Sequence, residues 1–144
     1  MIFLVGASRG IGLGLAKNFL SRGWSVIGTV RGGLRDELDE LAEHYPGRLI
    51  TEKLDMVNLD RLRTPGKRLS GRRLDILFVG AGSANMEVEP AAVITDQKYA
   101  RVLVTNALGP MRVIDAFQSQ VNADGVISVM SSGQGGITHN TNGL

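Results

Sequence analysis

The 144-residue sequence contains no cysteine, and aromatic residues make up only 5% of it. The absence of cysteine excludes disulfide bonds and thiolate metal ligands, and it fits a reducing cytoplasm. The two histidines, His44 and His139, stand alone without metal-ligand spacing. No apolar run approaches the roughly 20 residues that span a membrane, and the N-terminal residues show no signal-peptide pattern. We therefore expect a cytoplasmic protein with no metal and no membrane partner.

The sequence also lacks a large excess of charge of either sign, because 16 Lys and Arg residues against 14 Asp and Glu residues give a formal net charge of only +2. The basic residues that do cluster are Arg61, Arg63, Lys67, Arg68, Arg72 and Arg73. This stretch lacks the interleaved aromatic residues and the motifs of nucleic-acid sites. A solvated helix and loop is the preferred interpretation, and no nucleic-acid partner is expected.

Short apolar runs alternate with helical patterns along the chain. The expected strands are Ile2–Val5, Ser25–Val30, Leu49–Lys53, Leu74–Val79 and Val126–Met130. Several of them are mostly apolar runs, which is typical of parallel strands buried on both faces. The expected helices are Ile11–Ser21, Leu34–His44, Leu59–Leu69 and about Thr95–Gln120. This order predicts one domain over residues 1–144, with a doubly wound, Rossmann-type parallel α/β sheet that stops after about five strands.

The longest helical pattern is interrupted by Pro110, which follows Gly109. Proline removes an intrahelical hydrogen bond and kinks or breaks a helix. The carbonyls freed near such a kink can hold a water or a polar side chain. Asn106, one turn earlier, is therefore a candidate site residue. The alternative is a capping or surface asparagine.

The first strand runs directly into a turn with glycines in the spacing G-x-x-x-G-x-G. Glycines allow a tight turn and close approach of the backbone to a phosphate, and the N-terminus of the next helix adds free N–H groups. An ordinary strand–helix turn is the alternative, but the second strand completes a βαβ unit that favours nucleotide binding. The candidate cofactor-binding residues of this turn are Gly6, Ser8, Arg9, Gly10, Ile11 and Gly12.

Small and polar residues also follow the other strands, and ligands of open α/β sheets bind at these carboxyl ends. The second strand leads to Arg31 and Gly32, and the fifth to Ser131, Ser132 and Gly133. This pattern indicates a cofactor that lies across the whole edge of the sheet. The further candidates for cofactor binding are Arg31, Asp55, Met56, Gly80, Ala81 and Gly82.

The end of the second strand bears on the choice of cofactor. An NAD site usually has a carboxylate there, which binds the ribose 2′-hydroxyl. This chain has Arg31 instead, with Arg9 in the glycine turn, while Asp36 and Glu37 come later and fit the first turn of a helix. Two guanidinium groups can clamp a 2′-phosphate, so we expect NADP(H) to be preferred over NAD(H). The alternative is two surface arginines.

Taken in order, these motifs resemble the short-chain dehydrogenase/reductase family, and most of all its C-factor or sniffer-like carbonyl reductase branch. Gly6-x-x-x-Gly10-x-Gly12 is similar to the family's cofactor turn, and Ala81-Gly82 to the end of its Asn-Asn-Ala-Gly motif. The resemblance implies an oxidoreductase that transfers hydride between a nicotinamide and a small carbonyl or alcohol substrate. It also implies that Asp55 lies against the adenine ring, that Asn106 is the active-site asparagine and that Ser132 is the catalytic serine.

The resemblance further implies a homodimer or homotetramer formed through long helices. Val113, Ile114 and Phe117 would then be interface residues. The alternative, at least as good, is that these three side chains face the sheet.

The sequence departs from the family pattern in three places. Val5 replaces a threonine, and Val79-Gly80 replaces the paired asparagines, so a side-chain bond that braces the fourth strand in relatives is missing. No Tyr-x-x-x-Lys follows Ser132 before the sequence stops at Leu144. The chain is then either a piece of a longer reductase or a short form that binds nucleotide without turnover, as a sensor or interaction module. In both cases we expect the 144 residues alone to be nearly inactive. We also expect them either to aggregate through an open sheet edge or to depend on a partner subunit.

Overall fold

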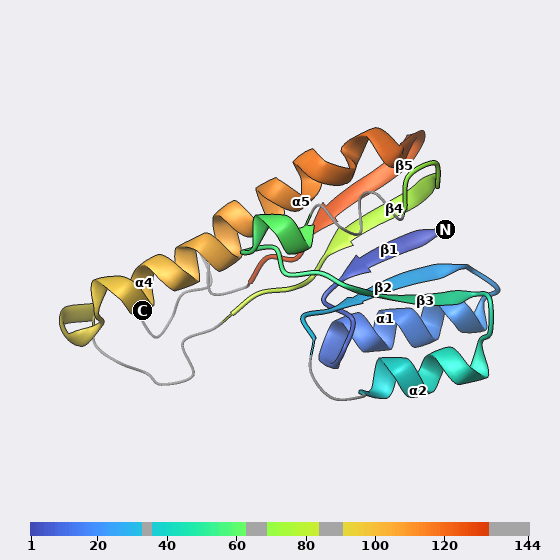
Figure 1. The fold of residues 1–144 in the computed structure, drawn as a ribbon, viewed down its shortest axis with the longest axis horizontal. Coiled ribbons are helices and arrows are strands. Elements are labelled where there is room, and N and C mark those ends of the chain that lie inside the picture. The colour runs from blue at the N-terminus through green and yellow to red at the C-terminus, as the bar shows by residue number, and fades with distance from the viewer. Residues whose placement is uncertain (33–35, 63–68, 84–90, 133–144) are drawn as a thin grey trace.

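The computed structural model describes residues 1–32, 36–62, 69–83 and 91–132. Its centre is a parallel sheet of five strands in the order β3-β2-β1-β4-β5 (Figure 1). The strands are Ile2–Val5 (β1), Val26–Val30 (β2), Leu49–Lys53 (β3), Leu74–Val79 (β4) and Val121–Val129 (β5). The prediction of a parallel, Rossmann-type α/β fold is therefore confirmed.

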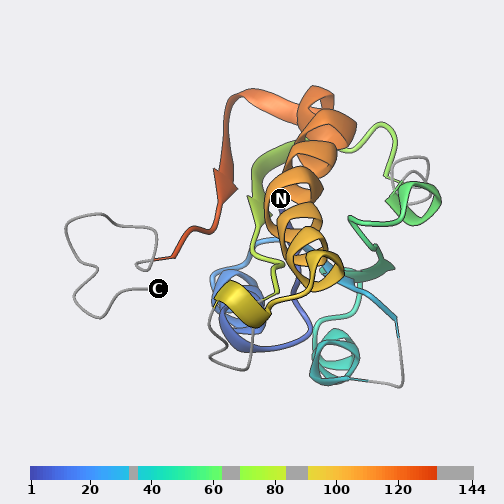
Figure 2. The same ribbon diagram turned by 90° about the vertical axis from the view of Figure 1, so that its left-hand side faces the viewer.

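Helices cover both faces of the sheet, and the apolar side chains of β1 are buried on each face. Ile2 and Leu4 pack in the same core cluster as residues of α1 (Gly10–Ser21) and α2 (Glu37–His44). Phe3 packs on the opposite face, where its ring meets Phe117 of α5 (Gly109–Phe117) edge-on with centroids 4.9 Å apart. Figure 2 shows α4 and α5 running across the sheet on the side away from α1 and α2.

The second helix begins later than the sequence suggests. The expected range started at Leu34, which lies outside the described residues, whereas α2 begins at Glu37. Asp36 is its N-cap and not a first-turn residue: its Oδ1 accepts hydrogen bonds from the backbone N–H groups of Leu38 and Asp39, at 3.0 and 3.3 Å. The third expected helix, Leu59–Leu69, is helical over residues 59–62. Residues 63–68 are not described, and residue 69 lies in a turn.

The predicted long helix is divided by a π-helical turn. It consists of α4 (Asp96–Leu103), the π turn Val104–Leu108, α5 and a short 3-10 turn over Gln118–Gln120. Pro110 lies at the start of α5, where its missing N–H group is tolerated. The disturbance expected at the proline is thus taken up one turn earlier, by the wider turn that contains Asn106.

The burial of α5 separates the two interpretations of its apolar residues. Val113 and Phe117 have no exposed surface and pack against the sheet, so the interface interpretation is wrong for these two side chains. The apolar residues on the outer surface of α4 and α5 are instead Tyr99, Leu103 and Met111, which are 60%, 48% and 66% exposed.

The last described strand is longer than predicted. Pairing begins at Leu74 with Val121, shifts at an irregularity, and continues at Ile76 with Val126. The intervening residues 122–125 are polar or small, which is why the sequence indicated a start at Val126. Val126 itself is 55% exposed on this edge strand. Within the described ranges, no helix is long and apolar enough to cross a membrane.

Candidate cofactor site

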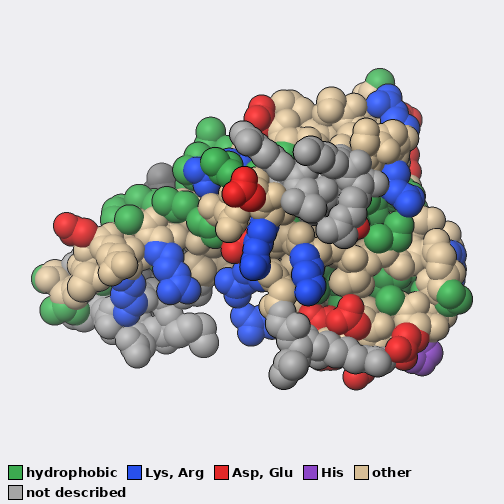
Figure 3. Space-filling model, viewed as in Figure 1, with side chains coloured by type: hydrophobic (Ala, Val, Ile, Leu, Met, Phe, Trp, Pro, Cys, Tyr) green, Lys and Arg blue, Asp and Glu red, His purple; other side chains and the backbone are tan. Residues whose placement is uncertain are grey.

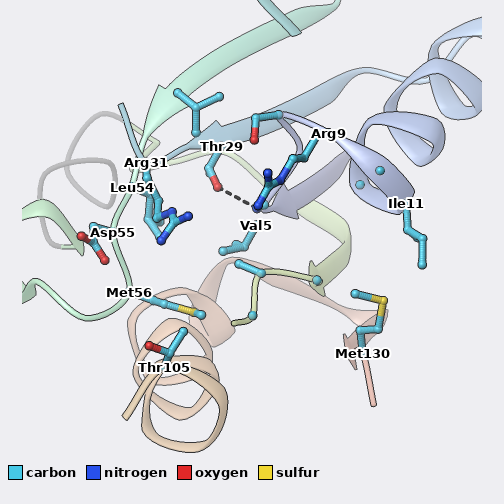
Figure 4. Close-up of a pocket in the computed structure, with 18 of the residues that line it drawn as sticks. Val5, Arg9, Ile11, Thr29, Arg31, Leu54, Asp55, Met56, Thr105 and Met130 are labelled. Atoms are coloured by element: carbon cyan, nitrogen blue, oxygen red, sulfur yellow. Dashed lines mark hydrogen bonds between the residues drawn. The ribbon is translucent and has the colours of Figure 1, made fainter. Parts of the chain in front are cut away.

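A cavity of about 570 Å³ opens at the carboxyl ends of the strands (Figure 4). All twelve residues that the sequence singles out for cofactor binding line it: Gly6, Ser8, Arg9, Gly10, Ile11, Gly12, Arg31, Asp55, Met56, Gly80, Ala81 and Gly82. They come from loops far apart in the sequence and meet because the strands are parallel and end at one edge. The structure thus brings the predicted residues together, and their contact with a cofactor stays a prediction.

The glycine turn is tightly packed. Gly6 has a φ of +92°, and a Cβ added there would lie 2.8 Å from the Cα of Ala81. A Cβ on Gly12 would lie 1.9 Å from the carbonyl oxygen of Gly6. The first and third glycines are therefore required by close contacts within the protein. Their spacing lets α1 begin directly at the cavity, with its N-terminal N–H groups at the mouth.

Neighbouring strands hold the turn from both sides. The carbonyl of Val5 accepts hydrogen bonds from the N–H groups of Gly80 and Ala81, both at 2.9 Å. On the other side, Ala7 N–H donates to the carbonyl of Thr29 at 2.9 Å, and Gly6 N–H donates to the Thr29 hydroxyl at 3.0 Å. The turn is thus anchored to β2 and to the loop after β4 at the same time.

Two arginines border the cavity. Arg9 occupies the N-cap position of α1 in extended conformation, and its side chain does not cap the helix. Arg31 directly follows β2, and Figure 4 shows both side chains extending toward the cavity. Within the described part of the chain, neither guanidinium has an ion-pair partner. Both are therefore available to an anionic ligand.

More positive charge lies beside Arg31. Arg61 donates a hydrogen bond from Nη1 to the carbonyl oxygen of Arg31 at 3.3 Å. Figure 3 shows Lys and Arg side chains gathered near the middle of the visible face, close to where β2 and β3 end. The nearest carboxylate in sequence, that of Asp36, lines the cavity, but its Oδ1 is engaged by the backbone of α2. The arrangement favours a ligand with phosphate at this end.

The residues that follow β3, among them Asp55 and Met56, line another part of the cavity. Asp55 accepts a hydrogen bond from Val57 N–H at 3.0 Å, which holds its carboxyl group in a tight turn. Met56 is 5% exposed and packs against Gly109, where an added Cβ would lie 2.9 Å from its Sδ. The start of α5 can approach the cavity closely because that residue is glycine.

The two predicted catalytic residues lie outside the lining of this cavity. Asn106 donates from Nδ2 to the carbonyl of Ser83 at 2.7 Å, and its Oδ1 accepts from Ser83 N–H at 2.8 Å. Its amide therefore ties the π turn to the loop after β4, and the residue is exposed, as the surface alternative expected. Its role as the active-site asparagine stays a prediction. Ser132 is exposed just beyond β5, and its catalytic role stays a prediction.

Sequence reasoning did not single out several lining residues, among them Thr29, Thr105 and Met130. Thr29 could have been found, because it is a polar residue within the apolar run of β2. Thr105 lies in the π turn, whose geometry the sequence did not indicate.

The sequence of this chain is similar to those of known dehydrogenases. The family model for short chain dehydrogenases matches residues 1–142. The short-chain dehydrogenase RED3 of Pyricularia oryzae is 31% identical over 98% of this chain and 60% of its own length. The 1-hydroxy-2-glutathionyl-2-methyl-3-butene dehydrogenase of a Rhodococcus species is 27% identical, over 99% of this chain and 60% of its own. The chain thus spans about 60% of the length of these relatives.

Solved structures are similar over nearly the whole chain. A short-chain dehydrogenase/reductase from Burkholderia multivorans with bound NADP is 46% identical, with a TM-score of 0.93 over 99% of this chain and 62% of that one. A carbonyl reductase from Pseudomonas aeruginosa in complex with NADP is 36% identical, with a TM-score of 0.90 over 95% and 60%. From the family match and the shared fold, we conclude that the chain belongs to the short-chain dehydrogenase/reductase family of oxidoreductases.

Proposed function

We propose that this chain forms the NADP(H)-binding part of a reductase that transfers hydride between a nicotinamide and a small carbonyl or alcohol substrate. The observation that carries the proposal is the cavity itself, where a glycine turn at a helix N-terminus lies beside two arginines that have no ion-pair partner among the described residues. Relatives of known structure with bound NADP support the choice of cofactor, and a carbonyl reductase among them supports the substrate class.

The residues of the cavity fit such a dinucleotide. The turn between Gly6 and Gly12 offers N–H groups and helix-dipole charge to the two central phosphates. Arg9 and Arg31 would bind the 2′-phosphate through charge-assisted hydrogen bonds. Asp55, fixed by its own turn, would lie against the adenine ring.

The chemistry at the other end of the cofactor is divided between the ligand and the protein. When bound, the nicotinamide supplies or accepts the hydride. Ser132 would orient the substrate carbonyl with its hydroxyl, an interaction that stabilises developing negative charge on oxygen. Asn106 would maintain the shape of the site by holding Ser83 in place.

A second candidate function follows from the sequence. The 144 residues contain no Tyr-x-x-x-Lys, the family motif that supplies the proton donor. General acid catalysis contributes roughly 10²- to 10⁴-fold to rate. A polypeptide limited to these residues would then bind the dinucleotide with very little turnover, as a sensor or interaction module.

Two measurements test the proposal. Titration calorimetry should give a lower Kd for NADPH than for NADH, and equal affinities or tighter NADH would contradict the cofactor assignment. NADPH oxidation should then be followed spectrophotometrically with a panel of aldehydes and ketones. Turnover by the full-length product of the gene supports the reductase, whereas NADPH binding by that product without turnover of any substrate supports the sensor.

The outer surface of α4 and α5 is proposed as the place where a second copy would bind. Tyr99 and Leu103 are large, exposed and one turn apart on α4, and Met111 is exposed on α5. Exposed apolar patches mark interaction sites. Light scattering on the wild type and on Leu103→Glu tests this. A dimer or tetramer that dissociates on substitution supports the proposal, and a monomeric wild type contradicts it.

A further inference from the structure

The N–H group of Gly6 has an unusual partner. Parallel pairing of β1 with β2 is recorded from Ile2 to Leu4, so Gly6 lies beyond the ladder. Its positive φ turns the backbone out of the strand direction. A backbone donor in a packed turn needs an acceptor, and here the acceptor is the Oγ1 of Thr29 on the neighbouring strand, at 3.0 Å.

Thr29 is placed to hold this donor. It is 2% exposed although it is a polar residue in an apolar strand. Its backbone carbonyl also accepts a hydrogen bond from Ala7 N–H at 2.9 Å. One residue of β2 therefore binds two consecutive N–H groups of the glycine turn. Figure 4 shows Thr29 between Arg31 and Arg9 at the cavity, with the bond to the turn dashed.

The bond matters for the position of the whole turn. Ala81, in the loop after β4, packs closely against Gly6, since a Cβ added to Gly6 would lie 2.8 Å from the Cα of Ala81. Gly6 therefore has little room to shift in that direction. Its carbonyl in turn lies under Gly12, the third glycine. A shift of Gly6 would therefore be transmitted to the N-terminal turn of α1.

We infer that the Thr29 hydroxyl is the positioning group that holds Gly6, and with it the glycine turn, in the geometry that receives the cofactor phosphates. This inference rests on the proposed function for its second half. Thr29 acts through the backbone of the turn and is a positioning residue.

The test compares three variants of the purified protein. Thr29→Val keeps the shape and removes the acceptor, Thr29→Ser restores a hydroxyl, and Thr51→Val is a matched control on the adjacent strand. Within the described residues, Oγ1 of Thr51 is buried without a hydrogen-bond partner, so its loss should change nothing at the turn. Hydrogen exchange of the Gly6 amide, NADP⁺ affinity and thermal unfolding are measured for each.

Thr29→Val should raise the exchange rate of the Gly6 amide and the Kd for NADP⁺ about tenfold each, within the range expected for an unpaired buried donor. Thr29→Ser and Thr51→Val should stay within about twofold of wild type in both, a range well below one tenfold step. Unchanged Gly6 exchange in Thr29→Val would overturn the inference directly.

The cofactor half can fail separately. If wild type binds NADP⁺ and Thr29→Val binds it equally well, the inference is overturned while the proposed function stands. If wild type binds no NADP⁺, the proposed function and the cofactor half of the inference are overturned, and Gly6 exchange alone decides whether Thr29 holds the turn. If Thr29→Val does not fold, Thr29→Ser provides the test. It must then show wild-type exchange of the Gly6 amide and wild-type affinity for NADP⁺, and a departure in either overturns the inference.

Discussion

Arg31 offers the sharpest test of cofactor choice. Its guanidinium extends into the cavity without an ion-pair partner in the described part of the chain, and its backbone is held separately by the bond from Arg61. Arg31→Ala therefore removes a cationic side chain while the hydrogen bond that anchors the turn remains. The perturbation is confined to the place where a 2′-phosphate would bind.

The expected magnitude follows from the bonds that would be lost. Hydrogen bonds to charged groups contribute about 1.5–3 kcal/mol, and each 1.4 kcal/mol corresponds to about tenfold in affinity. Arg31→Ala should therefore weaken NADPH binding by roughly 10- to 150-fold. NADH has no 2′-phosphate, so its Kd should change by no more than about twofold, far less than the step that one such bond produces. Arg31→Lys should fall between, because it retains charge but loses the planar, bidentate geometry.

The assay is titration calorimetry with NADPH and NADH at low and high salt. The NADPH effect should shrink as salt rises, because exposed charges are screened. Arg22→Ala is the matched control, since Arg22 is an exposed arginine at the far end of α1. Equal weakening of both nucleotides in Arg31→Ala, or none, would refute the assignment of Arg31 to the 2′-phosphate.

Three further outcomes are expected. Gly6→Ala should lower the free energy of unfolding by at least about 1–2 kcal/mol in urea titration, because φ is +92° and the new Cβ would meet Ala81; wild-type stability would contradict the close packing. Phe117→Ala should cost about 3–5 kcal/mol, since this fully buried ring packs edge-on against Phe3, and a loss below 1 kcal/mol would count against that core. The pKa of Asp75 is lowered by hydrogen bonds from the N-terminal amine and a neighbouring amide side chain. The ionised carboxylate therefore stabilises the fold at pH values above the ordinary carboxyl pKa of about 4. This contribution is lost as the pH falls toward the lowered pKa. Asp75→Asn should flatten that part of the stability curve, and an unchanged acid limb would exclude the contribution.

The fold was predictable because its central strands are largely apolar and β1 and β2 are buried on both faces. The continuous apolar run Ile2–Val5 and the mostly apolar run Leu74–Val79 mark central parallel strands, and both match the structure. The edge strand β5 was harder, since its first residues pair across an irregularity and are polar. The π turn was not predictable, because a proline indicates a disturbed helix without indicating which turn absorbs it.

By itself, the sequence determined which residues stand at the ends of strands and how the glycines are spaced, because these depend on local pattern. The tertiary structure decided which of those residues contact and hydrogen-bond to one another. Asn106 bonds to Ser83 and Thr29 bonds to Gly6, each across 23 positions, and such contacts exist only once crossover connections place distant strand ends side by side. The same assembly leaves Arg9 and Arg31 open at the cavity while Asp36 is engaged by its helix. The balance of charge at the site therefore comes from packing, which the sequence pattern alone does not determine.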